Sequence, residues 1–270
     1  MYPLISVLHT LEIYNQPNII CIDCRNYLDD DYKGRGEFLK SHIPGAVHFD
    51  LKHDLSGPIV QGVSGRHPLP DPVVLNYSLR SAGINPDTHV IAYDHANGSN
   101  AARLWWLLRW LGHENVQVLD GGLAAWLNQQ GAIDNEWILP EKGTFEGTPK
   151  ADMVVEMKEV KNHSDVLVDS REMRRYKGEH EPIDFVAGHI PGAICIPYMD
   201  SVTPSGIWKD QMELACRFQD LPEAPVFYCG SGVTACHNIL AYKIATGKDA
   251  LLYPGGWSEW IRHHKVTKQN

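Results

Sequence analysis

The most informative stretch of the sequence is Val226-Phe-Tyr-Cys-Gly-Ser-Gly-Val-Thr-Ala-Cys-His-Asn238. Its apolar start predicts a buried strand, and the small residues 230–232 end that strand before a helix begins near Thr234. Such a strand, loop and helix N-terminus direct backbone N–H groups at one point and favour negative charge there. Cys229 stands at the mouth of this loop, where a thiol ionises more readily than a free cysteine. We therefore interpret it as a nucleophile, with a buried structural cysteine as the alternative.

Length and composition narrow the class of protein. The chain has 270 residues, which suggests one large domain or two modest ones. A net charge of −9 without a basic run argues against nucleic acid and anionic membranes as partners. The start of the chain lacks a signal-peptide pattern, and no apolar stretch is long enough to span a bilayer. Six cysteines without disulfide-like spacing fit a reducing compartment, so we expect a cytoplasmic protein.

The sequence contains an internal duplication. Blocks of similar sequence recur in the same order in both halves, which indicates two copies of one domain. The matching blocks are residues 19–25 with 166–171, 42–46 with 189–193, 90–94 with 226–229, and 121–126 with 255–260.

Short apolar segments alternate with helical stretches in each half, and this alternation predicts an α/β fold with a parallel sheet flanked by helices. A segment rich in proline, glycine and charge, residues 136–153, is interpreted as a linker between domains of residues 1–135 and 154–270. The expected strands lie near residues 19–23, 46–50, 89–93, 116–119, 166–169, 193–197, 226–228 and 250–253. The expected helices include residues 72–82, 100–111 and 234–246.

The duplication also separates residues that serve the fold from candidates for chemistry. The Asp-x-Arg motifs at 23–25 and 169–171 occur in both halves and are interpreted as paired charges. The His-Ile-Pro-Gly-Ala blocks at 42–46 and 189–193 are shared too, and their histidines are expected to bond to the backbone. Features present in one half alone are therefore the candidates for function.

Two such differences concern charged or nucleophilic side chains. Cys229 matches Asp94 in the first half, so the first copy lacks the nucleophile. Arg175 matches Asp31, and a planar guanidinium is well suited to hold a carboxylate or oxyanion. We predict that Arg175 binds the anion of a substrate; the alternative is a solvated surface arginine beside Arg174.

These motifs resemble those of the rhodanese family, and in particular its two-domain sulfurtransferases. The resemblance covers nearly the whole chain and includes the segments 120–123, 188–193 and 254–257. It implies a tandem pair of rhodanese-like domains in which the second is catalytic and the first inactive. It also implies that Cys229 takes a sulfane sulfur from a small-molecule donor as a persulfide and passes it to a thiol, cyanide or thioredoxin-like acceptor. No metal or organic cofactor is expected.

The cysteine loop further resembles the subgroup that acts on 3-mercaptopyruvate, whose Cys-Gly-Ser/Thr-Gly-Val-Thr pattern residues 229–234 match throughout. The thiosulfate subgroup usually carries basic residues directly after the cysteine, and this loop has none. The resemblance implies that Ser231 and His67 relay protons in catalysis. The residues expected to form the anion cradle are Gly230, Gly232, Val233 and Thr234.

The sequence departs from the subgroup in two places. The aspartate expected to partner His67 has no clean match, because Asp50 and Asp54 flank its position. A second substrate arginine is missing where Ile183 stands, and the sequence leaves open whether Arg66, Arg103 or Arg174 replaces it.

Three other functions are weaker alternatives. Thiosulfate could replace 3-mercaptopyruvate as donor in the same chemistry. A cysteine phosphatase needs an arginine that closes the loop, and residues 230–236 contain none. A non-catalytic sulfur carrier would not need the intact loop.

The sequence leaves the acceptor and the oligomeric state open. The pair Cys21-x-x-Cys24 has metal-ligand spacing, but no second pair accompanies it.

Overall fold

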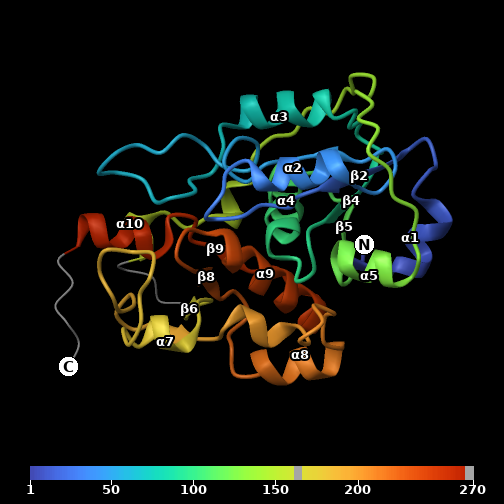
Figure 1. Cartoon of the computed structure of the whole chain (residues 1–270). Coiled ribbons are helices and arrows are strands. Elements are labelled where there is room, and N and C mark those ends of the chain that lie inside the picture. The colour runs from blue at the N-terminus through green and yellow to red at the C-terminus, as the bar shows by residue number, and fades with distance from the viewer. Residues whose placement is uncertain (161–165, 265–270) are drawn as a thin grey trace. The chain divides into compact units, whose positions relative to one another are not determined.

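The computed structural model describes residues 1–160 and 166–264, which form two compact units (Figure 1). The first unit consists of Met1–Gly57, Pro70–Lys150 and Val202–Trp208. The second consists of Pro58–Leu69 and the described parts of Ala151–Ser201 and Lys209–Asn270. Each unit thus includes a short segment whose neighbours in sequence belong to the other unit. The domain boundaries at residues 135 and 154 stay predictions.

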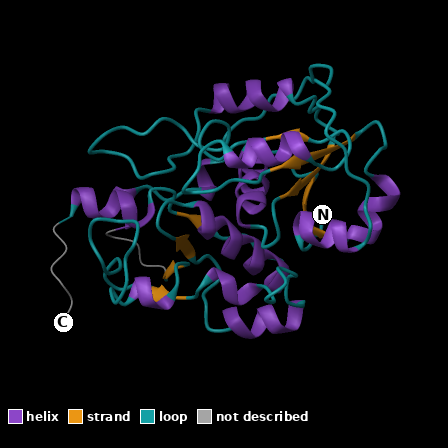
Figure 2. Cartoon of the chain, in the orientation of Figure 1, coloured by secondary structure: helices purple, strands orange, loops and turns teal. Residues whose placement is uncertain are grey.

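The first unit contains a parallel sheet of five strands in the order β1-β5-β4-β2-β3. Figure 2 shows these strands in orange with helices around them. The strands are β1 (Leu4–Ile5), β2 (Ile19–Asp23), β3 (Val47–His48), β4 (His89–Tyr93) and β5 (Val116–Leu119). The helices are α1 (Val7–Ile13), α2 (Lys33–Lys40), α3 (Pro72–Ser81), α4 (Ser99–Trp110) and α5 (Gly122–Asn128).

The second unit repeats this arrangement with a parallel sheet of four strands in the order β7-β6-β8-β9. The strands are β6 (Leu167–Asp169), β7 (Ile194–Cys195), β8 (Val226–Tyr228) and β9 (Leu251–Leu252). The α-helices are α6 (Met157–Val160), α7 (Met173–Tyr176), α8 (Gln211–Phe218), α9 (Val233–Thr246) and α10 (Gly256–His263). Two 3₁₀ turns, η1 (Ala151–Met153) and η2 (Tyr198–Ser201), complete the unit.

The predicted α/β fold with parallel sheets is confirmed, and a strand lies within every expected strand segment. In the first unit, β4 precedes the loop that starts with Asp94, and this strand lies between β5 and β2. In the second unit, β8 precedes the loop that starts with Cys229, and this strand lies between β6 and β9. Since all these strands are parallel, their carboxyl ends meet at one edge of the sheet, where ligands bind in open α/β folds.

The shared motifs stabilise each unit in the same way. The carboxylate of Asp23 is fully buried and pairs with Arg25 at 2.7 Å, and Asp169 is fully buried and pairs with Arg171 at the same distance. A buried charge is tolerated only when it is paired and hydrogen-bonded, and each aspartate also accepts from the backbone N–H of its arginine. The interpretation of these motifs as paired charges is confirmed.

The histidines of the repeated His-Ile-Pro-Gly-Ala blocks bond to the backbone, as expected. His42 Nδ1 lies 2.7 Å from the carbonyl oxygen of Phe38, and His189 Nδ1 lies 2.8 Å from that of Tyr176. Each ring therefore fixes the chain before a short strand. Within the described parts of the chain, no helix combines the length and apolar character needed to cross a bilayer.

Candidate active site

The cysteine loop joins the end of β8 to the start of α9. Gly232 is the N-cap of α9 and has a φ of 78°, a left-handed conformation that favours glycine. A Cβ added at Gly232 would also lie 2.4 Å from the carbonyl oxygen of Pro254, so a larger residue does not fit. The N–H of Gly232 donates to Sγ of Cys229 over 3.1 Å. The loop thus directs a backbone donor at the sulfur, as the sequence predicted for an anion site.

The first residues of helix α10 hold the cysteine loop through two backbone hydrogen bonds. The N–H of Trp257 donates to the carbonyl oxygen of Cys229 over 2.8 Å, and that of Ser258 donates to Gly230 over 2.9 Å. The approach depends on Gly256, whose φ is +58° and whose added Cβ would lie 2.5 Å from the Cys229 carbonyl oxygen. The loop carbonyls are therefore engaged by α10.

Cys229 itself is only 2% exposed. Burial suits both a nucleophile and a structural cysteine, so the surrounding groups distinguish them. Cys236, one helix turn into α9, is the structural comparison, since its Sγ lies 3.2 Å from a carbonyl oxygen, that of Gly232. Sγ of Cys229 instead accepts a backbone N–H, which favours negative charge on sulfur. This contrast supports the nucleophile.

The structure brings His67 and Ser231 together. Nδ1 of His67 lies 2.8 Å from Oγ of Ser231, although the two residues are 164 positions apart in the sequence. His67 belongs to the segment Pro58–Leu69, which is part of the second unit. Ser231 is 6% exposed and directly follows the two residues that start the loop. The arrangement suits a proton relay beside the thiol, a role that stays a prediction for both residues.

Arg175 extends from α7 toward the same loop. Its Nη2 donates to Glu181 over 2.7 Å and to Asp184 over 3.2 Å. A Cβ added at Gly230 would lie 3.6 Å from this nitrogen, so the guanidinium borders the loop. The binding of a substrate anion by Arg175 stays a prediction.

The remaining predicted cradle residues lie at the start of α9. Val233 is its first residue and is 7% exposed, and Thr234 is its second and is half-buried. Their backbone N–H groups belong to the first turn of the helix, where N–H groups lack partners within the helix. Their assignment to anion binding stays a prediction.

The charged groups around the loop balance one another. Arg171 donates to Glu181 over 3.2 Å, and Glu181 in turn binds Arg175, so the ion pairs form a connected network. Arg66 joins it through an ion pair with Asp184. The members are three arginines and three carboxylates: Arg66, Arg171, Arg175, Asp169, Glu181 and Asp184.

The candidates for a carboxylate partner of His67 have partners of their own in the first unit. Asp50 accepts from the ring of His53 at 2.8 Å, and Asp54 accepts from the backbone N–H of Asp50 over 2.8 Å. Burial raises the pKa of Asp54, with a smaller contribution from the neighbouring Asp50 charge. The partner of His67 stays open.

The first unit shows what the corresponding loop does without a cysteine. The carboxylate of Asp94, at the end of β4, accepts four backbone N–H groups at 2.9–3.3 Å, and its carbonyl accepts from Leu123 over 2.9 Å as that of Cys229 does from Trp257. The four donors are Ala96, Gly98, Asn100 and Ala101. This loop therefore binds a carboxyl group of the chain itself; burial raises the pKa of Asp94, and the backbone hydrogen bonds act in the opposite direction. The sequence showed that the nucleophile was lost there, but not that its place was filled by a bound carboxylate.

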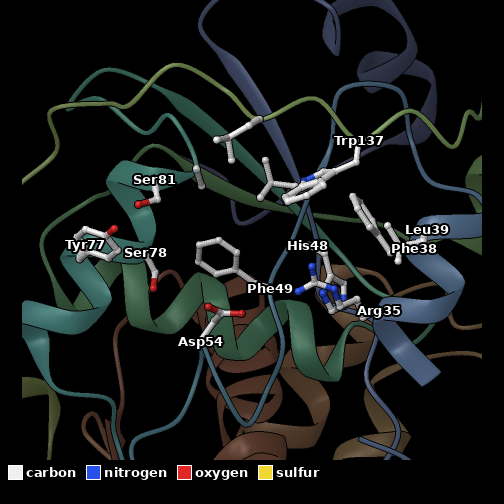
Figure 3. A pocket seen from close by; sticks show the side chains of 13 residues that line it. Arg35, Phe38, Leu39, His48, Phe49, Asp54, Tyr77, Ser78, Ser81 and Trp137 are labelled. Atoms are coloured by element: carbon white, nitrogen blue, oxygen red, sulfur yellow. The ribbon is translucent and has the colours of Figure 1, made fainter. Parts of the chain in front are cut away.

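A separate cavity of about 180 Å³ lies in the first unit (Figure 3). In this view Arg35 and His48 lie on one side and Tyr77 and Ser78 on the other. Apolar side chains form much of the rest of its lining: Phe38, Leu39, Val47, Phe49, Trp137 and Leu139. None of the described residues that line it is a cysteine.

The fold and the loop define a duplicated α/β protein whose second copy has a cysteine between a central strand and the N-terminus of a helix. The family model for the rhodanese-like domain matches residues 9–129 and 151–263. The chain therefore belongs to the rhodanese family, and the prediction of two rhodanese-like domains is confirmed.

Relatives in this family carry two kinds of name. A probable 3-mercaptopyruvate sulfurtransferase of Pseudomonas aeruginosa is 42% identical over 257 residues, which cover 92% of this chain and 90% of the relative. A thiosulfate sulfurtransferase of Mus musculus is 33% identical, over 91% of this chain and 86% of the relative. Among solved structures, the 3-mercaptopyruvate sulfotransferase SseA of Escherichia coli superposes with a TM-score of 0.83 at 31% identity, covering 96% of this chain and all of the other. The prediction that this chain is a sulfurtransferase is confirmed.

Proposed function

We propose that the chain takes sulfur from 3-mercaptopyruvate onto Cys229 and passes it from there to an acceptor. The Cys229 thiolate attacks the donor sulfur, an S–S bond forms and the bond between sulfur and carbon breaks. The electron pair stays on the carbon, and the proton of the donor thiol ends there, so the products are a cysteine persulfide and pyruvate. A second nucleophile then removes the outer sulfur, which gives ping-pong kinetics.

The hydrogen bond between His67 and Ser231 is the observation that favours 3-mercaptopyruvate as the donor. With 3-mercaptopyruvate a proton has to move from sulfur to carbon, and a hydroxyl paired with an imidazole can move it. With thiosulfate, sulfite leaves without needing a proton. A paired histidine and serine next to the reactive sulfur therefore favour the donor that requires proton transfer.

The charges around the loop favour the same donor. Three arginines face three carboxylates there, so their formal charges sum to zero before the thiolate is counted. A dianion such as thiosulfate would have to approach an uncompensated thiolate, and the 3-mercaptopyruvate carboxylate carries one charge fewer. Thiosulfate is the alternative donor, and the names of the relatives include both donors.

Steady-state assays of both donors test the proposal. We expect a higher kcat/KM with 3-mercaptopyruvate, and we expect His67→Gln and Ser231→Ala to lower kcat with this donor by roughly 10²-fold, the range of general acid–base catalysis. Turnover of thiosulfate should respond much less to both substitutions. A higher kcat/KM with thiosulfate in the wild-type protein would refute the donor assignment.

Intact-protein mass spectrometry tests the covalent step. Incubation with the donor should add one sulfur atom, and cyanide should remove it. Cys229→Ser should abolish the gain, whereas Cys236→Ser, a matched change at a buried cysteine in α9, should keep it. Absence of any sulfur gain with both donors would favour a non-catalytic module.

The acceptor is proposed as a thiol, cyanide or a thioredoxin-like protein, and the location as the cytoplasm. The proposed location rests on the six free cysteines, which suit a reducing compartment, and the proposed acceptors rest on the resemblance to sulfurtransferases.

A further inference from the structure

The Cys229 loop resembles that of the 3-mercaptopyruvate subgroup, in which a second arginine is expected to bind the substrate. This chain lacks that arginine. Ile183 stands at that position and its side chain is 45% exposed. Two of the three arginines that could compensate lie elsewhere: Arg103 donates to the carbonyl oxygen of Leu55 within the first unit, and Arg174 is exposed.

Of the three arginines, Arg66 is the one that lies beside the cysteine loop. A Cβ added at Gly230 would lie 2.6 Å from Nη2 of Arg66 and 3.6 Å from Nη2 of Arg175, so the two guanidinium groups converge on the residue after the cysteine. Burial lowers the pKa of Arg66, and the negative charge of Cys229, its largest electrostatic neighbour, acts in the opposite direction. At any physiological pH the guanidinium keeps its charge.

The backbone holds Arg66 in this place. Its N–H donates to Oγ of Ser258 in α10 over 3.1 Å. The preceding Gly65 permits this approach, because an added Cβ would lie 2.4 Å from the carbonyl oxygen of Gly255. The same helix therefore fixes both the cysteine loop and the segment that carries Arg66.

Asp184 connects the two arginines. Its carboxylate accepts from Nη1 of Arg66 and, at 3.2 Å, from Nη2 of Arg175, and its side chain is only 4% exposed. The side chains of Arg66 and Arg175 are 24% and 14% exposed, so both still reach solvent. A buried carboxylate that bonds two partly exposed guanidinium groups fixes their separation and direction.

We propose that Arg66 is the second arginine that binds the donor carboxylate, in place of the residue missing at position 183, and that Asp184 positions both arginines. The inference rests on the proposed function for its substrate. The carboxylate of an α-keto acid that accepts from Nη2 of Arg66, with the positive guanidinium of Arg175 beside it, would have its reactive end over the Cys229 loop.

Alkylation of Cys229 tests the clamp without any sulfur transfer. In 3-bromopyruvate and bromoacetone the same carbon is attacked by the thiolate and loses bromide, but only the first reagent carries a carboxylate. Peptide mass spectrometry gives the rate at Cys229 for each reagent. We expect Arg66→Gln to lower the ratio of the 3-bromopyruvate rate to the bromoacetone rate by about 10- to 100-fold, as for loss of a charge-assisted hydrogen bond. A change in the reactivity of Cys229 itself affects both rates and cancels in this ratio.

Matched variants sharpen the test. Arg174→Gln removes a nearby exposed arginine and should leave the ratio unchanged, and Asp184→Asn should lower the ratio. An unchanged ratio in Arg66→Gln, or an equal fall in both rates, would overturn the proposal.

The outcome separates this inference from the proposed donor. If wild-type protein takes no sulfur from 3-mercaptopyruvate while the alkylation ratio depends on Arg66, the donor assignment fails and the carboxylate clamp stands. If 3-mercaptopyruvate is the donor but Arg66→Gln changes neither its KM nor the alkylation ratio, the clamp alone is refuted.

Discussion

Replacing Gly256 by alanine should damage the cysteine loop, and the duplication supplies a matched control at Gly122. Both glycines start a helix whose first turn bonds to the loop after the central strand, β8 or β4, with φ values of +58° and +56°. An added Cβ would lie 2.5 Å from the Cys229 carbonyl oxygen in one unit and 2.6 Å from that of Asp94 in the other. The two substitutions therefore impose nearly the same local strain on two loops, one that starts with Cys229 and one that starts with Asp94.

The size of the effect follows from the geometry. A residue other than glycine in the left-handed region costs about 1–2 kcal/mol, and forcing a Cβ into a filled space adds roughly 1–3 kcal/mol. Each variant should thus lose about 2–5 kcal/mol in the free energy of unfolding. Ordinary contact begins at 3.4 Å, so the Cys229 carbonyl has to retreat by about 0.9 Å. A misplacement near 1 Å can lower a rate by about 10²-fold.

Urea unfolding measures the stability of both variants, and kcat with 3-mercaptopyruvate, measured where both are folded, reports on the loop. Gly256→Ala should lose about 10²-fold in kcat, and Gly122→Ala should keep wild-type kcat despite a similar loss of stability. Equal losses of kcat in the two variants, or wild-type kcat in Gly256→Ala, would refute the view that α10 holds the reactive geometry.

Three further predictions concern the fold and the thiols. Asp94→Ala should lower the free energy of unfolding by roughly 2–4 kcal/mol in urea titrations, since four backbone donors lose their acceptor, and wild-type stability would contradict it. Burial raises the pKa of Cys21 and of Cys195 to about 12, so at pH 8 only about 10⁻⁴ of each is thiolate; iodoacetamide should modify the exposed Cys216 far faster, as peptide mapping would show. Asp210 caps α8 with a reciprocal hydrogen-bonded pair, and Asp210→Ala should cost about 1 kcal/mol in thermal unfolding; an unchanged Tm would speak against that cap.

Much of the fold could be predicted because the duplication repeats its own pattern. Apolar runs such as 89–93 and 226–228 are buried on both faces, and glycine-containing turns end them, so their strands could be located from the sequence. The two-residue strand β1 and the short helices α6 and α7 were not predicted, because such short elements show no periodicity and depend on tertiary contacts.

The parts of the site whose residues are consecutive in the sequence could be predicted. Cys229 and the glycines of its loop are consecutive, so a strand-loop-helix pattern reveals them. Arg66 and Asp184 are 118 positions apart, and no local pattern joins them. His67 was proposed through the family resemblance, whereas its distance to Ser231 required coordinates. Gly65 before Arg66 was the available signal, since it permits a close approach of the backbone.

The allocation of Pro58–Leu69 to the second unit has a consequence for how the protein can be divided. A fragment cut at the linker and beginning at residue 151 would keep Cys229 but lose both Arg66 and His67. A second copy expressed by itself would therefore lack two residues of the proposed site, and we expect the proposed reaction to need the sequence of both copies.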